Sequence, residues 1–186
     1  MSLEKWKKIG SAVVLAGKFG KKLIVQLFLN PKTGKEEEYV LFAQKDWSVI
    51  FAVTKDNQVL VVSEYKQGRD DVGDELPAGT ANFEGESPET VAKRELREET
   101  GYESGEVIHL GSYWIATRSS TTKFHCFLAK DCEKVGPAKL DENEDIESRL
   151  EPLERWLMMI QDGRITEPSA VVATMRALPH LGFEII

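Results

Sequence analysis

Residues 88–100 constrain the fold of this chain more than any other stretch, because they are bounded by signals for both ends of a helix. Ser87 is suited to the N-cap, and Pro88 fits the first helical position, where no backbone N–H is needed. Gly101 can adopt the left-handed conformation that ends a helix. We therefore predict one helix of about three to four turns over residues 88–100. Its apolar positions are Val91, Ala92 and Leu96.

Three carboxylates gather on one side of this predicted helix. Glu95, Glu98 and Glu99 occupy positions i, i+3 and i+4. Two partly buried charges roughly 4 Å apart repel by about 4 kcal/mol at an effective dielectric of about 20, so the cluster needs compensating charge. Arg94 and Arg97 supply some, and a divalent cation would supply more. Oxygen ligands without nearby His or Cys favour Mg²⁺ or Mn²⁺ over zinc. The alternative is a solvated, charged surface helix without a ligand.

The segment before the helix strengthens the metal-site interpretation. Residues 79–102 resemble the Nudix box, G-x5-E-x7-R-E-U-x-E-E-x-G-U, in which U is a bulky apolar residue. The chain has Glu86, seven further residues, and then the run R-E-L-R-E-E-T-G-Y over residues 94–102. It departs from the pattern at one place, because six residues, not five, separate Gly79 from Glu86.

Composition and charge narrow the class of protein. The 186 residues suffice for one well-filled core, and 41% hydrophobic with 30% charged residues is typical of a globular protein. A net charge of −7 argues against general binding to nucleic acid. Cys126 and Cys132 fit no zinc or redox spacing, and the sequence shows neither a signal peptide nor a membrane-length apolar run. We expect a cytoplasmic protein with no nucleic-acid or membrane partner.

Two parts are expected along the chain. Residues 1–45 form a β-rich arm, and residues 46–186 form the main domain. In the arm, β-rich runs at 11–15, 23–29 and 37–43 are separated by turn signals at 17–20 and 30–35. The lysines of the arm are explained by solvated strand edges.

The main domain is predicted to alternate strands and helices. Two apolar strands at 48–53 and 58–64 are expected to form a hairpin through residues 55–57. Further strands are predicted at 107–115 and 124–129, and further helices at 152–161 and 168–178. In these two helices, Trp156 and Met175 are interpreted as core residues.

An acidic segment over residues 140–146 has two interpretations. Asp141, Asn143 and Asp145 have the alternating spacing of a calcium loop. However, Ile146 occupies the place of the glycine and Pro152 that of the bidentate glutamate, so we reject an EF-hand. The segment is either an acidic surface loop or a second source of carboxylates for the metal site.

Nearly the whole chain resembles Nudix hydrolases of the ADP-ribose pyrophosphatase group. Beyond the box, the matching segments are residues 65–67, 75–79, 142–146, 163–165 and 169–171. The resemblance implies an α+β fold: an α/β/α sandwich around a mixed sheet, with an N-terminal antiparallel β arm. It also implies a homodimer in which the arms of the two subunits cross.

The same resemblance assigns metal ligands and catalytic groups. It implies that the carbonyl of Ala78 and the side chains of Glu95, Glu99 and Glu144 bind Mg²⁺, with Mn²⁺ as the alternative ion. Glu98 lies beside these ligands and is expected to be one of the catalytic residues, together with Arg94 and Glu142.

Two further catalytic roles follow from the resemblance. Arg94 is expected to orient a box carboxylate, and Glu142 to activate the attacking water.

Four residues are candidates for binding the substrate. Lys66 occupies a position where the group often has a phosphate-binding arginine, and Arg69 is a second cation before the acidic helix; both are alternatively solvated loop cations. Arg118 lies in a polar loop that lacks the proline common in the group, and is a candidate for recognising a different nucleotide sugar. Trp47 is a candidate for stacking on a base, or a core residue.

The resemblance implies Mg²⁺-dependent hydrolysis of the pyrophosphate bond of ADP-ribose or a related nucleoside diphosphate sugar, which gives a nucleoside monophosphate and a sugar phosphate. One alternative is a non-catalytic nucleotide-sugar sensor on the same fold. Another is a hydrolase of the same family that acts on dinucleoside polyphosphates or coenzyme A.

Overall fold

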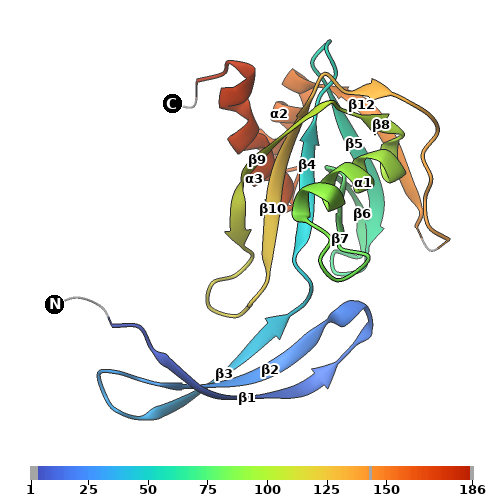
Figure 1. Ribbon diagram of the computed structural model, residues 1–186. Helices are drawn as coiled ribbons and strands as arrows, with labels where there is room; N and C mark the ends of the chain where they lie inside the picture. Colours follow the sequence, from blue (N-terminus) through green and yellow to red (C-terminus); the bar gives the residue numbers. More distant parts are fainter. Residues whose placement is uncertain (1–3, 143, 185–186) are drawn as a thin grey trace. The chain divides into compact units, whose positions relative to one another are not determined.

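The computed structural model describes residues 4–142 and 144–184, which form two compact units (Figure 1). The first unit combines the N-terminal residues up to Asp46 with the loop Trp114–Lys123. The second combines Trp47–Tyr113 with Phe124 and the residues that follow. The loop Trp114–Lys123 thus joins the arm, whereas the sequence-based division leaves it in the main domain.

The first unit is an antiparallel sheet in the order β1 (Lys7–Ala16), β2 (Lys22–Leu29) and β3 (Glu36–Ala43). The three strands predicted in the arm are confirmed; β2 and β3 are each one residue longer than predicted, and β1 is twice as long as predicted. The short 3-10 helix η1 (Lys18–Gly20) links β1 to β2. The loop Trp114–Lys123 is held to the end of β3, because the N–H of Phe42 donates to the carbonyl of Ser119 and its carbonyl accepts from the N–H of Thr121.

The second unit contains two main sheets. One has the order β7-β4-β10-β9, in which β4 and β10 run parallel and β4 and β7 antiparallel; the other has the antiparallel order β12-β5-β6. A two-stranded ladder pairs β8 with β11. The bounds are β4 (Trp47–Ala52), β5 (Gln58–Lys66), β6 (Asp71–Glu75), β7 (Ala78–Thr80), β8 (Tyr102–Glu103), β9 (Glu106–Trp114), β10 (Lys123–Lys130), β11 (Glu133–Lys134) and β12 (Ile146–Pro152).

Three α-helices cover these sheets. They are α1 (Pro88–Thr100), α2 (Leu153–Gln161) and α3 (Pro168–Ala177), and the 3-10 helix η2 (Leu178–Leu181) follows α3. Ser87, Pro88 and Gly101 take the positions predicted for them at the two ends of α1. Ser87 accepts a hydrogen bond from the N–H of Thr90, and Gly101 ends the helix with φ 77°.

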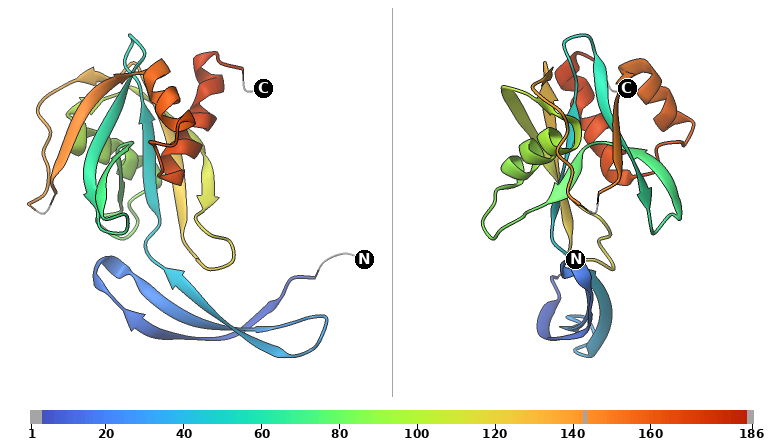
Figure 2. Two further views of the ribbon diagram at one scale, coloured as in Figure 1. Left: turned by 180° about the vertical axis from the view of Figure 1, so that it is seen from behind. Right: turned by 90° about the vertical axis from the view of Figure 1, so that its right-hand side faces the viewer.

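The helices lie on opposite faces of the sheets, α1 on one side and α2 with α3 on the other (Figure 2). Strand β4 shows how the sequence achieves this, since its buried side chains alternate between two cores. Val49 and Phe51 pack in the core beneath α2 and α3, whereas Ile50 and Ala52 pack in the core beneath α1. The predicted α/β/α sandwich around a mixed sheet is therefore confirmed.

The predicted hairpin of the first two main-domain strands is wrong. β4 and β5 lie in different sheets, and among the described residues they are joined by a single bridge between Val53 and Val59. The turn after β4 is present, because the N–H of Thr54 donates to the carbonyl of Gln58. The strands then separate, because β4 pairs with β10 and β7, whereas β5 pairs with β12 and with β6, the strand that directly follows it.

One predicted core residue is also misplaced. Met175 remains 39% exposed on α3. The buried face of this helix carries small side chains, which allow it to approach β4 closely: Ser169, Ala170, Ala173, Thr174 and Ala177. Trp156 on α2 is fully buried as predicted, and its indole N–H donates to the hydroxyl of Thr174 at 2.9 Å.

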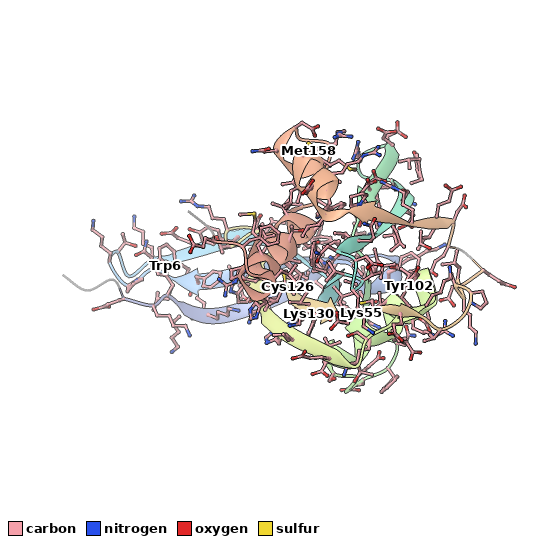
Figure 3. The ribbon with its side chains drawn as sticks, turned by 90° about the horizontal axis from the view of Figure 1, so that it is seen from above. Trp6, Lys55, Tyr102, Cys126, Lys130 and Met158 are labelled. Atoms are coloured by element: carbon pink, nitrogen blue, oxygen red, sulfur yellow. The ribbon has the colours of Figure 1, made fainter. Side chains whose placement is uncertain are left out.

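The sulfur-containing side chains occupy both surface and core positions. Met158 lies on the outer surface of α2, and Cys126 lies within the strands (Figure 3). Cys126 and Cys132 are both buried free thiols, and burial raises the pKa of each to about 12. Among the described helices, none is long and apolar enough to cross a membrane.

Candidate functional site

The predicted carboxylate cluster forms on α1. Glu95 and Glu99 are one turn apart and are buried, at 7% and 5% exposure, while Glu98 is half-buried. Their burial follows from the helical period, because Leu96 and Ala92 on the same helix pack into the core beneath α1. Two carboxylates are thereby held at the edge of the hydrophobic core.

Arg94 connects these carboxylates to the loop before the helix. Its Nη1 donates to Glu95 Oε1 at 2.9 Å and to Glu98 Oε2 at 2.8 Å. Its Nε donates to Glu86 Oε1 at 3.1 Å, and its Nη2 donates to the carbonyl of Thr80 at 2.8 Å. Because the guanidinium is planar and rigid, these four contacts fix the directions of the three glutamates.

Strand β7 approaches the glutamates through its main chain. The N–H of Ala78 donates to Glu99 Oε2 at 3.2 Å. A Cβ atom at Gly79 would lie 2.0 Å from Glu95 Oε1, so only glycine leaves this carboxylate in its present position. Antiparallel pairing with β4 and a hydrogen bond from the N–H of Ile50 to the carbonyl of Pro77 hold the segment in place.

The electrostatics of the site indicate missing positive charge. Burial raises the pKa of Glu95 to about 7, and although Arg94 opposes this, the charges of Glu98 and Glu144 add to the rise. Burial and the neighbouring charge of Glu95 raise the pKa of Glu99 well above its usual range, and the charge of Glu144 again contributes. Shifts of this kind mark buried carboxylates whose ionised form lacks a counter-charge.

The late acidic loop contributes Glu144 to this region. Glu144 acts electrostatically on both buried glutamates, and its carboxylate accepts the N–H of Asp141 at 2.9 Å. Glu142 is exposed in the same loop. Asn143 lies outside the described residues, so its part in the rejected calcium-loop pattern receives no structural description.

The two predicted phosphate-binding cations differ in their surroundings. Lys66 on β5 is half-buried between Glu64, at 2.6 Å, and Glu75, at 3.2 Å, and its charge acts on Glu99. Arg69 is exposed and donates to the hydroxyl of Thr166 at 3.2 Å. The charge of Lys66 therefore acts on a glutamate of α1, whereas the side chain of Arg69 contacts Thr166 and Asp71.

The other two candidates for substrate binding are placed as follows. Trp47 stacks on Phe124 with ring centroids 5.6 Å apart and packs against the core beneath α2 and α3, which favours its interpretation as a core residue. Arg118 is exposed in the loop Trp114–Lys123 of the first unit, where its charge acts on Tyr39.

The donor set fits a hard divalent cation. Within residues 4–142 and 144–184, His, Cys, Asp and Glu side chains form no group of three or more that could hold a metal ion by itself. The fit rests instead on two buried carboxylates, Glu95 and Glu99, whose raised pKa values a cation would reverse. Carboxylate and carbonyl oxygens suit Mg²⁺ or Mn²⁺.

Two features of the site escape prediction from sequence. Glu75 pairs with Lys66 only through the antiparallel pairing of β5 and β6. The carbonyl of Thr80 receives Arg94 because β7 ends beside α1. The position of Glu75 directly before residues 76–79 is the one local signal that connects it to the site.

Comparison with known proteins agrees with this geometry. Residues 44–167 match the model of the NUDIX domain. The chain is 32% identical over 125 residues to a methanol dehydrogenase activator of Bacillus methanolicus, with 67% of each chain covered. It is 25% identical over 176 residues to an ADP-ribose pyrophosphatase of Bacillus subtilis, with 92% of this chain and 91% of the relative covered.

Two further similarities were found. A GDP-mannose pyrophosphatase of Citrobacter koseri is 34% identical over 92 residues, which cover 48% of each chain. A solved structure described as an ADP compounds hydrolase superposes with a TM-score of 0.82 over 98% of this chain and 97% of the other, at 21% identity, which establishes the shared fold. With the domain match spanning most of the chain and the box residues gathered on α1, the protein belongs to the NUDIX domain family.

Proposed function

We propose that this NUDIX-family protein is a Mg²⁺-dependent pyrophosphohydrolase of ADP-ribose or related nucleoside diphosphate sugars. The products would be a nucleoside monophosphate and a sugar phosphate. The observation that carries the proposal is the buried pair Glu95 and Glu99, which Arg94 and the N–H of Ala78 hold in place without neutralising them fully.

The residues that would hold the cation are Glu95, Glu99, the carbonyl of Ala78 and Glu144. When bound there, a divalent ion supplies charge neutralisation on the pyrophosphate oxygens and lowers the pKa of a coordinated water. The steric fit of Glu95 against Gly79 supports this set, because it directs the carboxylate towards the strand that carries Ala78.

The protein's own groups then divide the remaining tasks. Arg94 keeps Glu95 and Glu98 in fixed directions, which limits the reorganisation needed during the reaction. Glu142, on a loop that also carries Glu144, is proposed to accept the proton of the attacking water. Lys66, whose positive charge acts on Glu99, is proposed to attract the negatively charged diphosphate.

The choice of substrate class rests on the extent of the similarity. The relative named ADP-ribose pyrophosphatase matches over 92% of this chain, a span that extends beyond the NUDIX domain. Relatives named GDP-mannose pyrophosphatase match over shorter stretches. Arg118 is proposed to distinguish among the nucleotide sugars, and Mn²⁺ is proposed as an alternative ion.

The arm supports a homodimer as the working state. Single exposed apolar residues are normal on a protein surface, but the arm exposes several. They are Val13 at 57%, Val14 at 64%, Leu15 at 61%, Phe19 at 83% and Val40 at 59%. We propose that a second copy of the chain covers them. Sedimentation equilibrium would test this, since a monomer at micromolar concentration would contradict it.

The proposed activity is tested by a substrate panel with Mg²⁺ and with EDTA. The panel contains ADP-ribose, ADP-glucose, UDP-glucose, GDP-mannose, a diadenosine polyphosphate and coenzyme A. We expect metal-dependent release of a nucleoside monophosphate from one or more nucleotide sugars. Tight binding of a nucleotide sugar without turnover would instead indicate a sensor. Preferred hydrolysis of the diadenosine polyphosphate or of coenzyme A would contradict the proposed substrate class.

A further inference from the structure

Arg97 lies on α1 at the position that the box pattern leaves variable, between the apolar residue and the paired glutamates. Its side chain is 26% exposed and, among the residues that the structure describes, it donates to Glu103 and to the carbonyl of Pro137. The Nε atom donates to Glu103 Oε1 at 3.0 Å, and the Nη1 atom donates to the carbonyl of Pro137 at 3.1 Å. One guanidinium thus connects the box helix to the strand after it and to a distant loop.

The loop reached by Arg97 is tied to the end of α1 by its main chain as well. The N–H of Val135 donates to the carbonyl of Gly101 at 2.9 Å, and the N–H of Lys139 donates to the carbonyl of Glu98 at 2.7 Å. The approach is close, since a Cβ atom at Gly101 would lie 2.2 Å from the carbonyl oxygen of Gly136. Residues 135–139, which we call the stem, therefore pack directly against the C-terminal end of α1.

The stem leads into the segment that carries Glu142 and Glu144. Because Lys139 is bonded to the carbonyl of Glu98, the stem is fixed three residues before Glu142. The charge of Glu144 acts on the buried glutamates of α1, so displacement of the stem would change the geometry between the two groups of carboxylates.

We propose that Arg97 is a positioning residue, which anchors the stem to α1 and thereby sets where Glu142 and Glu144 stand relative to Glu95 and Glu99. The anchoring rests on the contacts above alone. Its effect on turnover rests on the proposed function. Arg97 touches neither of the buried glutamates in the described contacts, so it acts through the stem.

The shape of the guanidinium makes the proposal testable by a conservative change. Arginine donates in two directions from one rigid plane, whereas the lysine ammonium is a single point charge. Arg97→Lys can therefore keep the charge and one partner, but not Glu103 and Pro137 together. Arg97→Ala loses both. Lys93→Ala is the matched control, because Lys93 is an exposed cation one turn earlier that forms an ion pair with Glu89 at 2.5 Å.

Hydrogen exchange measures the anchor without reference to activity. In Arg97→Ala, exchange at the amides of Val135 and Lys139 should be about tenfold faster, as expected for losing a charge-assisted hydrogen bond. Arg97→Lys should show a smaller increase and Lys93→Ala none. Gly136→Ala gives a second route, because its Cβ would lie 2.9 Å from Arg97 Nη2 and displace the guanidinium. Unchanged exchange in Arg97→Ala and Gly136→Ala would overturn the anchoring.

Steady-state kinetics then separates positioning from a merely structural role. With Mg²⁺ and the best substrate of the panel, kcat of Arg97→Ala should fall about tenfold while KM and the thermal midpoint stay close to wild type, and Arg97→Lys should recover part of the rate. Faster exchange with unchanged kcat would overturn the positioning role. If the wild-type protein hydrolyses nothing in the panel, the proposed function fails, while exchange still decides the anchoring.

Discussion

Substitution of Gly79 by alanine is a sharp test of the site, because the structure predicts different effects on folding and on turnover. The new Cβ atom would lie 2.0 Å from Glu95 Oε1 and 2.8 Å from Oε2. A carbon and an oxygen in ordinary contact are about 3.5 Å apart, so the carboxylate must move by roughly 1.5 Å. It is the flexible end of a side chain, so the fold should lose only about 1 kcal/mol.

Turnover should suffer much more than stability. A displacement of about 1 Å in a catalytic arrangement is enough to lower the rate about 100-fold. We therefore expect kcat of Gly79→Ala to fall at least about 100-fold with Mg²⁺, while urea denaturation shows a nearly native protein. Gly105→Ala is the control, because a Cβ atom there meets nothing within 4 Å.

Wild-type turnover in Gly79→Ala would show that the position of Glu95 against β7 does not matter for the reaction. A loss of several kcal/mol in the free energy of unfolding would also contradict the reasoning, because it would mean that the carboxylate cannot swing aside. Equal loss of turnover in Gly105→Ala would remove the specificity of the effect.

Three further predictions follow from the same geometry. Arg94→Lys keeps the charge but loses the planar fork that reaches three carboxylates and one carbonyl, so kcat should fall about 10- to 100-fold in steady-state kinetics. Because burial raises the pKa of Glu95 from 4.5 to about 7 and that of Glu99 well above 4.5, the folded metal-free protein binds more protons than the unfolded chain. Its stability should therefore fall as the pH rises from about 5 to about 8, as thermal unfolding in EDTA would measure, and a rise would contradict the assignment. Gly101→Ala places a Cβ atom 2.2 Å from the carbonyl oxygen of Gly136 at a residue with φ 77°, so urea denaturation should show a loss of about 2–3 kcal/mol.

Local signals explain why α1 could be predicted from the sequence. Ser87, Pro88 and Gly101 each act within one turn of the helix end, and each takes the role expected of it. The helical period alone places Glu95 and Glu99 on one side, next to Leu96. These features need no information from the rest of the chain.

Features that depend on distant partners could not be predicted in this way. The turn after β4 gives a local hairpin signal, yet β4 pairs with β10 from a segment more than seventy residues later. The inward face of α3 is decided by close contact with β4, which favours small residues over Met175. The pairing of Lys66 with Glu75 likewise depends on the register of β5 and β6.

The central claim is that Glu95 and Glu99 hold a divalent cation for hydrolysis of a nucleotide sugar. The most direct measurement is phosphorus NMR spectroscopy of the products formed from ADP-ribose and from GDP-mannose. Each substrate is incubated with wild-type protein and with Glu99→Gln, in Mg²⁺ and in EDTA. We expect a nucleoside monophosphate and a sugar phosphate only with wild-type protein and Mg²⁺. Equal hydrolysis by Glu99→Gln, or by wild-type protein in EDTA, would contradict the claim.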